Sequence, residues 1–344
     1  MRATPAISSP QRLWLARFAW FAVFYNVAVT VWGAFVRASG SGAGCGNHWP
    51  LCNGQVIPLS PGFHTIVEFT HRQMTTGLSL VVVALLTWTF RATTRGNAAR
   101  FFSVASLILL LNEAFLGALL VKLGYVTDNQ SAGRVVVMSI HFSNTLLLLT
   151  ALTLTARFLS TPSAQETRAL ASARGFGWAA GGLAATFVAG ISGSTAALGD
   201  TLYPPASLSQ ALAQDYAVGA PTLLRLRVLH PVSAVLAGAF VVWLILRSRK
   251  FVSSDAGLLP AERNRLMRFT GRANIVIALL ALQFALGTAD ILLLAPAWMQ
   301  LLHLLGADLY WVALVLLATE TIWPANKIAS GRNSEELAAA ADAA

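Results

Sequence analysis

The sequence predicts an all-α integral membrane protein whose eight transmembrane helices form two pseudo-symmetric four-helix bundles. Of its 344 residues, 56% are hydrophobic and only 11% are charged, which lies outside the range of soluble domains of this length. Apolar runs of about 20 residues, the length that crosses a bilayer, recur along the chain. The two halves of the chain also show the same features in the same order, as expected of a duplicated unit.

The expected spans follow one another with short connections. They cover residues 18–38, 72–92, 101–121, 135–156, 176–197, 229–247, 273–294 and 300–322. The first span is too long for a cleaved signal peptide. It runs into the glycine-rich stretch GSGAGCG instead of a small-residue cleavage site, so we expect it to stay in the protein. An even number of spans places both termini on the same side of the membrane.

A polar connection at residues 157–174 divides the spans into four and four. The predicted domains are an N-terminal half at 1–160, an inner linker at 161–175, a C-terminal half at 176–325 and a tail at 326–344. The first and fifth spans each end in small residues and are followed by an aromatic-Pro pair, Trp49-Pro50 or Tyr203-Pro204. The third and seventh spans share a Leu-Gly pair, in NEAFLG at 112–117 and LQFALG at 282–287.

Lysine and arginine gather on one side of the predicted bundle. With the N-terminus taken as cytoplasmic, the inner segments hold 18 of these 24 residues. The positive-inside rule therefore places both termini in the cytoplasm. The net charge of +10 reflects this topology, and it does not indicate a nucleic-acid partner.

The two cysteines, Cys45 and Cys52, lie in the first outer loop, in CGNHWPLC. An oxidising outer compartment and the short spacing favour a disulfide that closes a small loop. Two unpaired thiols are one alternative. A metal site that adds His48 is another, but the loop offers no obvious fourth ligand.

Four of the six histidines fall in the spans, and these four form the main signal in the sequence. They lie in the even-numbered spans, each within the expected first two turns from the outer side: His71, His141, His230 and His303. The other two, His48 and His64, fall in the first outer loop. All four imidazoles in the spans are therefore expected at a similar depth.

Paired imidazoles on facing apolar helices suit a heme, with one axial histidine from each of two helices. A single histidine could simply hydrogen-bond a neighbouring helix, but polar groups inside a bilayer are costly, and four at one depth favour a shared role. Zinc or copper would need further donors at each site. Outer arginines could meet heme propionates or extend to the membrane interface: Arg37, Arg72, Arg134, Arg225 and Arg227.

The two halves differ beside the first histidine of each pair. Glu68 precedes His71 by one helical turn on the same face, whereas Arg227 occupies the matching position before His230. We interpret this as a division of labour, in which the first pocket performs chemistry and the second holds a permanent redox cofactor. The alternative is that Glu68 is a solvated loop carboxylate or pairs with Arg72.

With these residues in view, the sequence resembles the heme A synthase family, over about residues 15 to 325. The resemblance rests on the ExxHR pattern from Glu68 to Arg72, the cysteine pair, the stretch VRASGSGAGC after the first span and the four histidines. The cysteine pair matches the bacterial type. The resemblance implies a multi-pass protein of the bacterial inner membrane.

The resemblance also implies an activity, which is oxidation of the C8 methyl group of heme O to a formyl group by successive hydroxylations. Heme O would bind as substrate between His71 and His141, with Arg72 beside it and Glu68 as the catalytic residue. A prosthetic heme b would stay on His230 and His303. Each of these histidines would be an axial ligand of a heme iron.

Other functions and partners stay open at this point. A di-heme b-type electron-transfer cytochrome shares every histidine argument, and a transporter built from two repeats would need charged or broken helices at the midplane. Candidate partners are heme O synthase, cytochrome oxidase assembly factors, an unidentified electron donor, membrane lipid and a second copy of the chain. The long outer loop 199–227 is a candidate cover for the second pocket.

Overall fold

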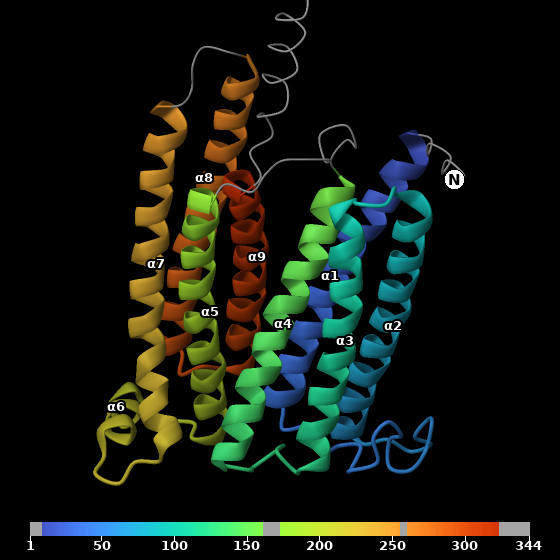
Figure 1. Ribbon diagram of the computed structural model, residues 1–344. Coiled ribbons are helices and arrows are strands. Elements are labelled where there is room, and N and C mark those ends of the chain that lie inside the picture. The colour runs from blue at the N-terminus through green and yellow to red at the C-terminus, as the bar shows by residue number, and fades with distance from the viewer. Residues whose placement is uncertain (1–8, 161–172, 255–259, 323–344) are drawn as a thin grey trace, which may run out of the picture.

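The protein is a bundle of long helices, and its computed structural model describes residues 9–160, 173–254 and 260–322 (Figure 1). The helices in these residues are α1 Ser9–Ala38, α2 Phe63–Ala92, α3 Ala98–Lys122, α4 Ala132–Leu159, α5 Ala173–Leu202, α6 Leu208–Tyr216, α7 Thr222–Ser254, α8 Pro260–Leu292 and α9 Ala297–Ile322. Eight of them, all but α6, are long and apolar enough to cross a membrane. The prediction of an all-α multi-pass membrane protein is confirmed. The expected tail and most of the expected linker lie outside the described residues.

Several helices begin earlier than the apolar runs that predicted them. α2 starts at Phe63 instead of residue 72, and α7 starts at Thr222 instead of residue 229. The extra turns carry polar groups such as Glu68, which are buried under the loops, so the helix continues beyond the apolar run. His64 consequently lies in α2 and not in the loop, and Glu68 lies on the helix.

The depth of the histidines changes with these boundaries. The four histidines are the ninth residue of α2, the tenth of α4, the ninth of α7 and the seventh of α9. They therefore lie about two to three turns into their helices, deeper than expected for the first three. The four histidines still lie at similar depths in their helices, which is the feature on which the sequence argument depends.

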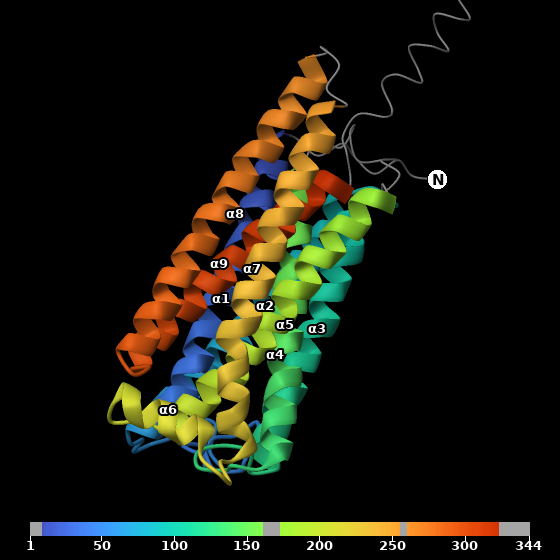
Figure 2. The same ribbon diagram turned by 90° about the vertical axis from the view of Figure 1, so that its left-hand side faces the viewer.

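The helices form two groups that match the two halves of the chain (Figure 1). α1 to α4 pack on one another on one side, and α5, α7, α8 and α9 pack on one another on the other side. We call the end that bears segments 39–62, 123–131, 203–221 and 293–296 the histidine end, and the opposite end the far end. Segment 199–227 is mostly helical, since it contains the end of α5, all of α6 and the first turns of α7, and α6 lies at the histidine end (Figure 2).

Polar contacts join the two halves at three heights. At the histidine end, Arg37 of α1 donates to Thr201 of α5 at 2.5 Å and to Gln300 of α9 at 2.9 Å. Midway, the indole N–H of Trp311 in α9 donates to the carbonyl of Leu146 in α4 at 3.0 Å. Near the far end, the buried Glu320 of α9 binds an arginine of α4 and two of α8: Arg157, Arg268 and Arg272.

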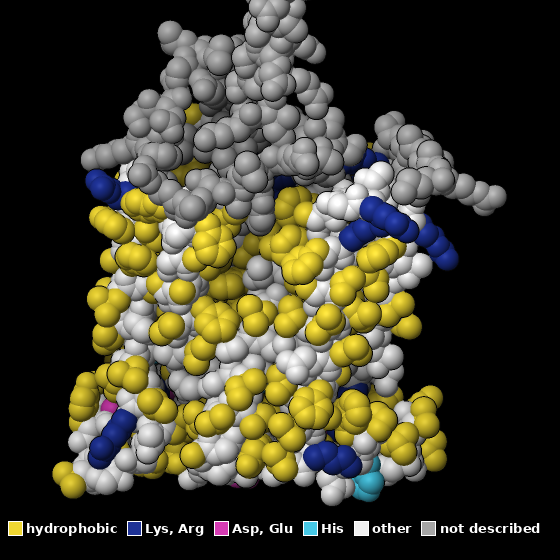
Figure 3. Space-filling model, viewed as in Figure 1, with side chains coloured by type: hydrophobic (Ala, Val, Ile, Leu, Met, Phe, Trp, Pro, Cys, Tyr) yellow, Lys and Arg dark blue, Asp and Glu magenta, His cyan; other side chains and the backbone are white. Residues whose placement is uncertain are grey.

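The outer surface matches a lipid environment. In Figure 3, hydrophobic side chains cover the middle of the visible face, and lysine and arginine lie toward its two ends. Large apolar side chains such as Leu80, Phe101 and Ile108 are exposed on the helices. The buried core lies between helices, and its larger cluster joins α1 to α4 with α9. Apolar groups thus face both lipid and the core, as expected of membrane helices.

Candidate functional site

Three of the four histidine rings lie against a glycine of a neighbouring helix. A Cβ atom added at Gly33 of α1 would lie 3.0 Å from the ring of His71, and one added at Gly193 of α5 would lie 2.9 Å from the ring of His230. One added at Gly287 of α8 would lie 3.2 Å from His303. The absence of a side chain at these glycines makes room for the imidazoles. The sequence shows small residues at these places as a feature shared by the two halves, but it does not show that they lie against the histidines.

The C-terminal histidines face each other across the bundle. The ring centres of His230 and His303 are 6.3 Å apart, with the planes at 72°. Nδ1 of His230 lies 3.2 Å from both the Ala189 carbonyl and the Ser192 hydroxyl, which leaves its Nε2 for another partner. Nδ1 of His303 has no hydrogen-bond partner in the part of the chain that the structure describes.

The N-terminal histidines come from α2 and α4, the helices that correspond to α7 and α9 of the other half. Nδ1 of His71 has no hydrogen-bond partner among the described residues. Nδ1 of His141 lies 3.3 Å from Oε1 of Glu113, at ion-pair distance but without the alignment of a hydrogen bond. Nothing in the sequence alone shows that Glu113 of α3 reaches a histidine of α4.

Glu68 is buried, and both of its carboxylate oxygens have a partner. Its side chain accepts a hydrogen bond from the backbone N–H of Cys45 at 2.8 Å and pairs with Arg72 at 2.5 Å. Only 4% of the residue is exposed, so the interpretation as a solvated loop carboxylate is wrong, whereas the alternative pairing with Arg72 is present. Cys45 and Cys52 form a disulfide, as expected. The acid therefore lies between His71, one turn along α2, and the disulfide loop.

The start of α7 is covered in a different way. Arg227 takes the place of Glu68 and binds Asp200 of α5 at 3.1 Å and Asp215 of α6 at 2.6 Å. These ion pairs hold α6 over the start of α7. Segment 199–227 therefore covers this end of the C-terminal half through α6, and the contact depends on an arginine and two aspartates.

Four of the five arginines expected near propionates bind protein groups in this structure, and the fifth, Arg225, is exposed on α7. Arg72 donates to the carbonyl of Leu51 at 2.6 Å in addition to its pair with Glu68. Arg134 donates to the carbonyls of Thr127 and Asn129. Arg72 and Arg134 thus bind the loops of the histidine end, whereas Arg37 and Arg227 bind neighbouring helices.

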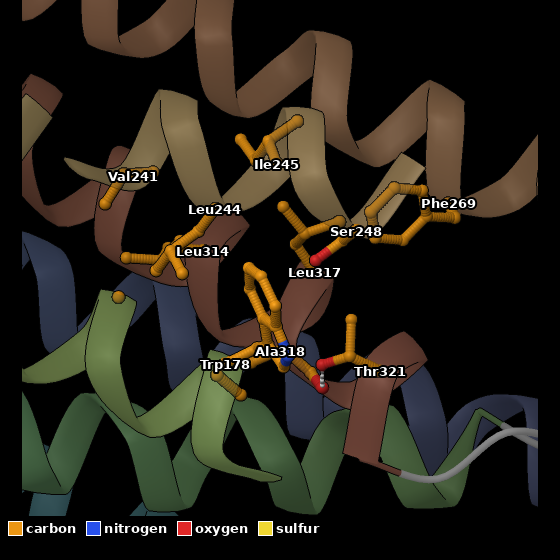
Figure 4. A pocket seen from close by; sticks show the side chains of 12 residues that line it. Trp178, Val241, Leu244, Ile245, Ser248, Phe269, Leu314, Leu317, Ala318 and Thr321 are labelled. Carbon is orange, nitrogen blue, oxygen red and sulfur yellow. Dashed lines mark hydrogen bonds between the residues drawn. The ribbon is translucent and has the colours of Figure 1, made fainter. Parts of the chain in front are cut away.

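A separate pocket lies toward the far end of the C-terminal half, between α5, α7, α8 and α9 (Figure 4). Its lining is apolar apart from a few small polar groups, and it includes Trp178, Phe269 and Leu317. None of the predicted site residues lines it. The chemistry of the molecule is therefore expected at the histidine end.

Comparison with known proteins identifies the family. The family model described as COX15-CtaA, cytochrome oxidase assembly protein, matches residues 16–315. The chain belongs to the COX15-CtaA family. The resemblance to heme A synthases drawn from the sequence motifs is confirmed by this match.

Individual relatives carry two kinds of name. A Thermus thermophilus protein named protoheme IX farnesyltransferase is 42% identical over 309 residues, which cover 90% of this chain and 48% of that protein. Proteins named heme A synthase are 32% identical over 154 residues in Exiguobacterium sibiricum and 36% identical over 129 residues in Shouchella clausii. These matches cover 45% and 38% of this chain, and 49% and 40% of the relatives. The chain spans about half or less of the curated relatives it matches.

Membership of the COX15-CtaA family implies heme-related chemistry, and the histidine donors fit a heme. Two imidazoles that share one metal through nitrogens about 2 Å away have their ring centres about 6 Å apart. The spacing of 6.3 Å between His230 and His303 agrees with that arrangement. The described residues contain no group of three or more His, Cys, Asp or Glu placed to hold a metal ion.

Proposed function

We propose that this protein is a heme A synthase, which oxidises the C8 methyl group of heme O to a formyl group by successive hydroxylations and loss of water. The family match and the relatives named heme A synthase support this activity. The observation that carries it is the buried carboxylate of Glu68, one turn from His71, without an acidic counterpart in the other half. A pure electron carrier would have no need for an acid beside only one histidine pair.

Each half then has its own task, and we propose the domain bounds given above, 1–160 for the N-terminal half and 176–325 for the C-terminal half. Heme O would bind between His71 and His141 in the N-terminal half, and a prosthetic heme b would bind between His230 and His303. Bound heme supplies the oxidising chemistry that an unactivated methyl group requires, because no side chain can provide it. The residues of this chain hold the hemes, exclude water and handle protons.

Glu68 is the proposed catalytic acid and base. Its carboxylate is held by the Cys45 N–H and the Arg72 guanidinium, which fix its direction on the face of α2 that also carries His71. A carboxylate in such a place can accept a proton and return it as the methyl group is hydroxylated. Arg72 remains the candidate for a propionate contact because it lies one residue beyond His71 and already reaches the loop above.

The topology supports a site on the outer side of the bacterial inner membrane, with both termini cytoplasmic. The lysine and arginine excess lies at the far end of the bundle, and the disulfide lies at the histidine end, as an oxidising compartment would require. Heme O synthase, cytochrome oxidase assembly factors and an electron donor are candidate partners at this membrane. A homo-oligomer is a further candidate assembly.

The farnesyltransferase name of the Thermus relative suggests a second activity. About half of that protein lies outside the match, so its name can describe the other part. Transfer from a prenyl diphosphate commonly uses carboxylates that hold Mg²⁺. Because the described residues form no such cluster, the observations favour heme A synthesis.

The test is to purify the protein from cells that make heme O and to separate its extracted hemes by chromatography. Wild-type protein should yield heme b together with heme A or its hydroxylated precursor. Glu68→Gln should keep heme b and heme O and form heme A about 10²- to 10⁴-fold more slowly, the usual size of an acid-base contribution. Asp128→Asn, at an exposed carboxylate of the same end, is the matched control and should leave the product unchanged.

Three results would contradict the proposal. Two equivalents of heme b and no heme O product would indicate an electron-transfer cytochrome. A farnesylated heme formed from heme b would indicate the transferase. Full heme A formation by Glu68→Gln would remove the role of the acid.

A further inference from the structure

A group of polar side chains surrounds Glu113 between α3 and α4. Its Oε1 accepts a hydrogen bond from Thr145 at 2.5 Å, and its Oε2 accepts one from Asn144 at 2.5 Å. Asn144 is itself held by Asn112 at 2.8 Å. These contacts fix the carboxylate inside an apolar bundle, with Oε1 3.3 Å from Nδ1 of His141.

The C-terminal half has no such group at the corresponding place. When the Leu-Gly pairs of α3 and α8 are aligned, Gln283 corresponds to Glu113. When His141 and His303 are aligned, Gly306 corresponds to Asn144. Gln283 packs against Gly306, and its Nε2 has no hydrogen-bond partner among the described residues.

The two histidines of the N-terminal pair are therefore held differently. A histidine that binds a metal through Nε2 usually donates its Nδ1–H to an acceptor, which fixes the ring and makes it a stronger ligand. His141 has a carboxylate at this position, the strongest type of acceptor, whereas Nδ1 of His71 has no partner among the described residues. Such contacts are often long or poorly aligned before the ligand binds and tighten afterwards.

We propose that Glu113 is a positioning residue that makes His141 the firmly held axial ligand of the N-terminal heme and leaves His71 as the weaker one. The inference rests on the proposed binding of heme O between these two histidines. The weaker ligand is also the one that lies one turn from Glu68. The firm ligand and its carboxylate thus come from α3 and α4, and the weaker ligand and the catalytic acid come from α2.

The test uses the full-length protein loaded with both hemes, studied by redox titration at one fixed pH and by optical and EPR spectroscopy. Glu113→Gln keeps the shape of the side chain and removes the negative charge beside His141. The midpoint potential of the N-terminal heme should rise, because a less electron-rich imidazole stabilises ferric iron less well. The potential of the C-terminal heme should stay unchanged.

A second variant separates positioning from a general loss of structure. Thr145→Val removes the hydroxyl that shares Oε1 with His141 and leaves the carboxylate in place. It should shift the N-terminal potential downward, opposite to Glu113→Gln. Disturbed packing would not produce shifts of opposite sign in the two variants.

A third comparison tests the unequal pair directly. His71→Ala should retain the N-terminal heme with a changed EPR spectrum, whereas His141→Ala should lose it, with the C-terminal heme present in both. Equal loss in the two variants, or unchanged potentials in both Glu113→Gln and Thr145→Val, would overturn the inference. These measurements do not depend on product formation. They can therefore contradict the role of Glu113 without contradicting heme A synthesis, and they can support that role even if both hemes are permanent.

Discussion

The N-terminal and C-terminal halves carry histidine pairs at similar depth, but the side chains around the pairs differ in charge. Glu68 and Glu113 lie beside the first pair, and Arg227 and Gln283 occupy the corresponding positions in the second half. The covers differ too, since the disulfide loop contacts the first turns of α2 and α6 contacts the first turns of α7. The comparison shows that two four-helix groups with histidines at similar depth differ in the charged residues beside those histidines.

The largest effect is expected from filling the space beside a histidine ring in one half only. Gly33→Val should remove heme from the N-terminal half alone, and Gly193→Val should remove it from the C-terminal half alone, because even a Cβ meets the histidine ring at about 3 Å. Gly117→Val is the matched control, since a Cβ there meets nothing within 4 Å. Heme content measured by pyridine hemochrome and chromatography checks each variant. Loss of both hemes from either variant would show that the halves do not bind independently.

A smaller effect is expected at the cover of the second half. Arg227→Gln removes the charge that holds Asp200 and Asp215, and the loss should cost about 1–3 kcal/mol of stability. The loss of stability should be local to α6, so limited proteolysis within residues 203–221 should become faster. Heme A formation in the N-terminal half should continue. An unchanged cleavage rate would show that other contacts hold α6.

A loss of stability of similar size is expected from opening the disulfide. The double change Cys45→Ser and Cys52→Ser opens the loop but leaves the backbone N–H of residue 45 and the side chain of Arg72 to hold Glu68. We expect about 2 kcal/mol lower stability from the freed loop and a loss of heme A formation far smaller than that of Glu68→Gln. Melting followed by circular dichroism and heme extraction measure the two quantities. A loss as large as that of Glu68→Gln would assign a chemical role to the sulfurs.

The four histidines stand out because ionisable residues are rare in apolar spans. Glu68 stands out because it precedes His71 by one helical turn, so these candidates could be named from residue type and spacing alone. The contacts of Gly33 with His71 and of Glu113 with His141 could not, because they depend on how each helix is rotated about its axis. Helices that are apolar on almost every side have no hydrophobic face that fixes this rotation.

The helix boundaries were misjudged for a related reason. The apolar run marks the part of a helix that lies in lipid, but α2 and α7 continue outward under loops that bury their polar side chains. Glu68 and Arg227 both lie in these extensions. Hydropathy therefore located the spans and missed the turns that carry the differences between the halves.

The three contacts between the halves have a consequence for motion. Arg37, Trp311 and Glu320 cross the junction at both ends and in the middle, so one half cannot rock against the other without breaking at least one of them. Alternating access by rocking, the usual motion of two-repeat transporters, would have to break this bracing. The gap between the two histidine pairs is thereby kept nearly constant, and an electron passing from one half to the other would tunnel across the same distance in every turnover.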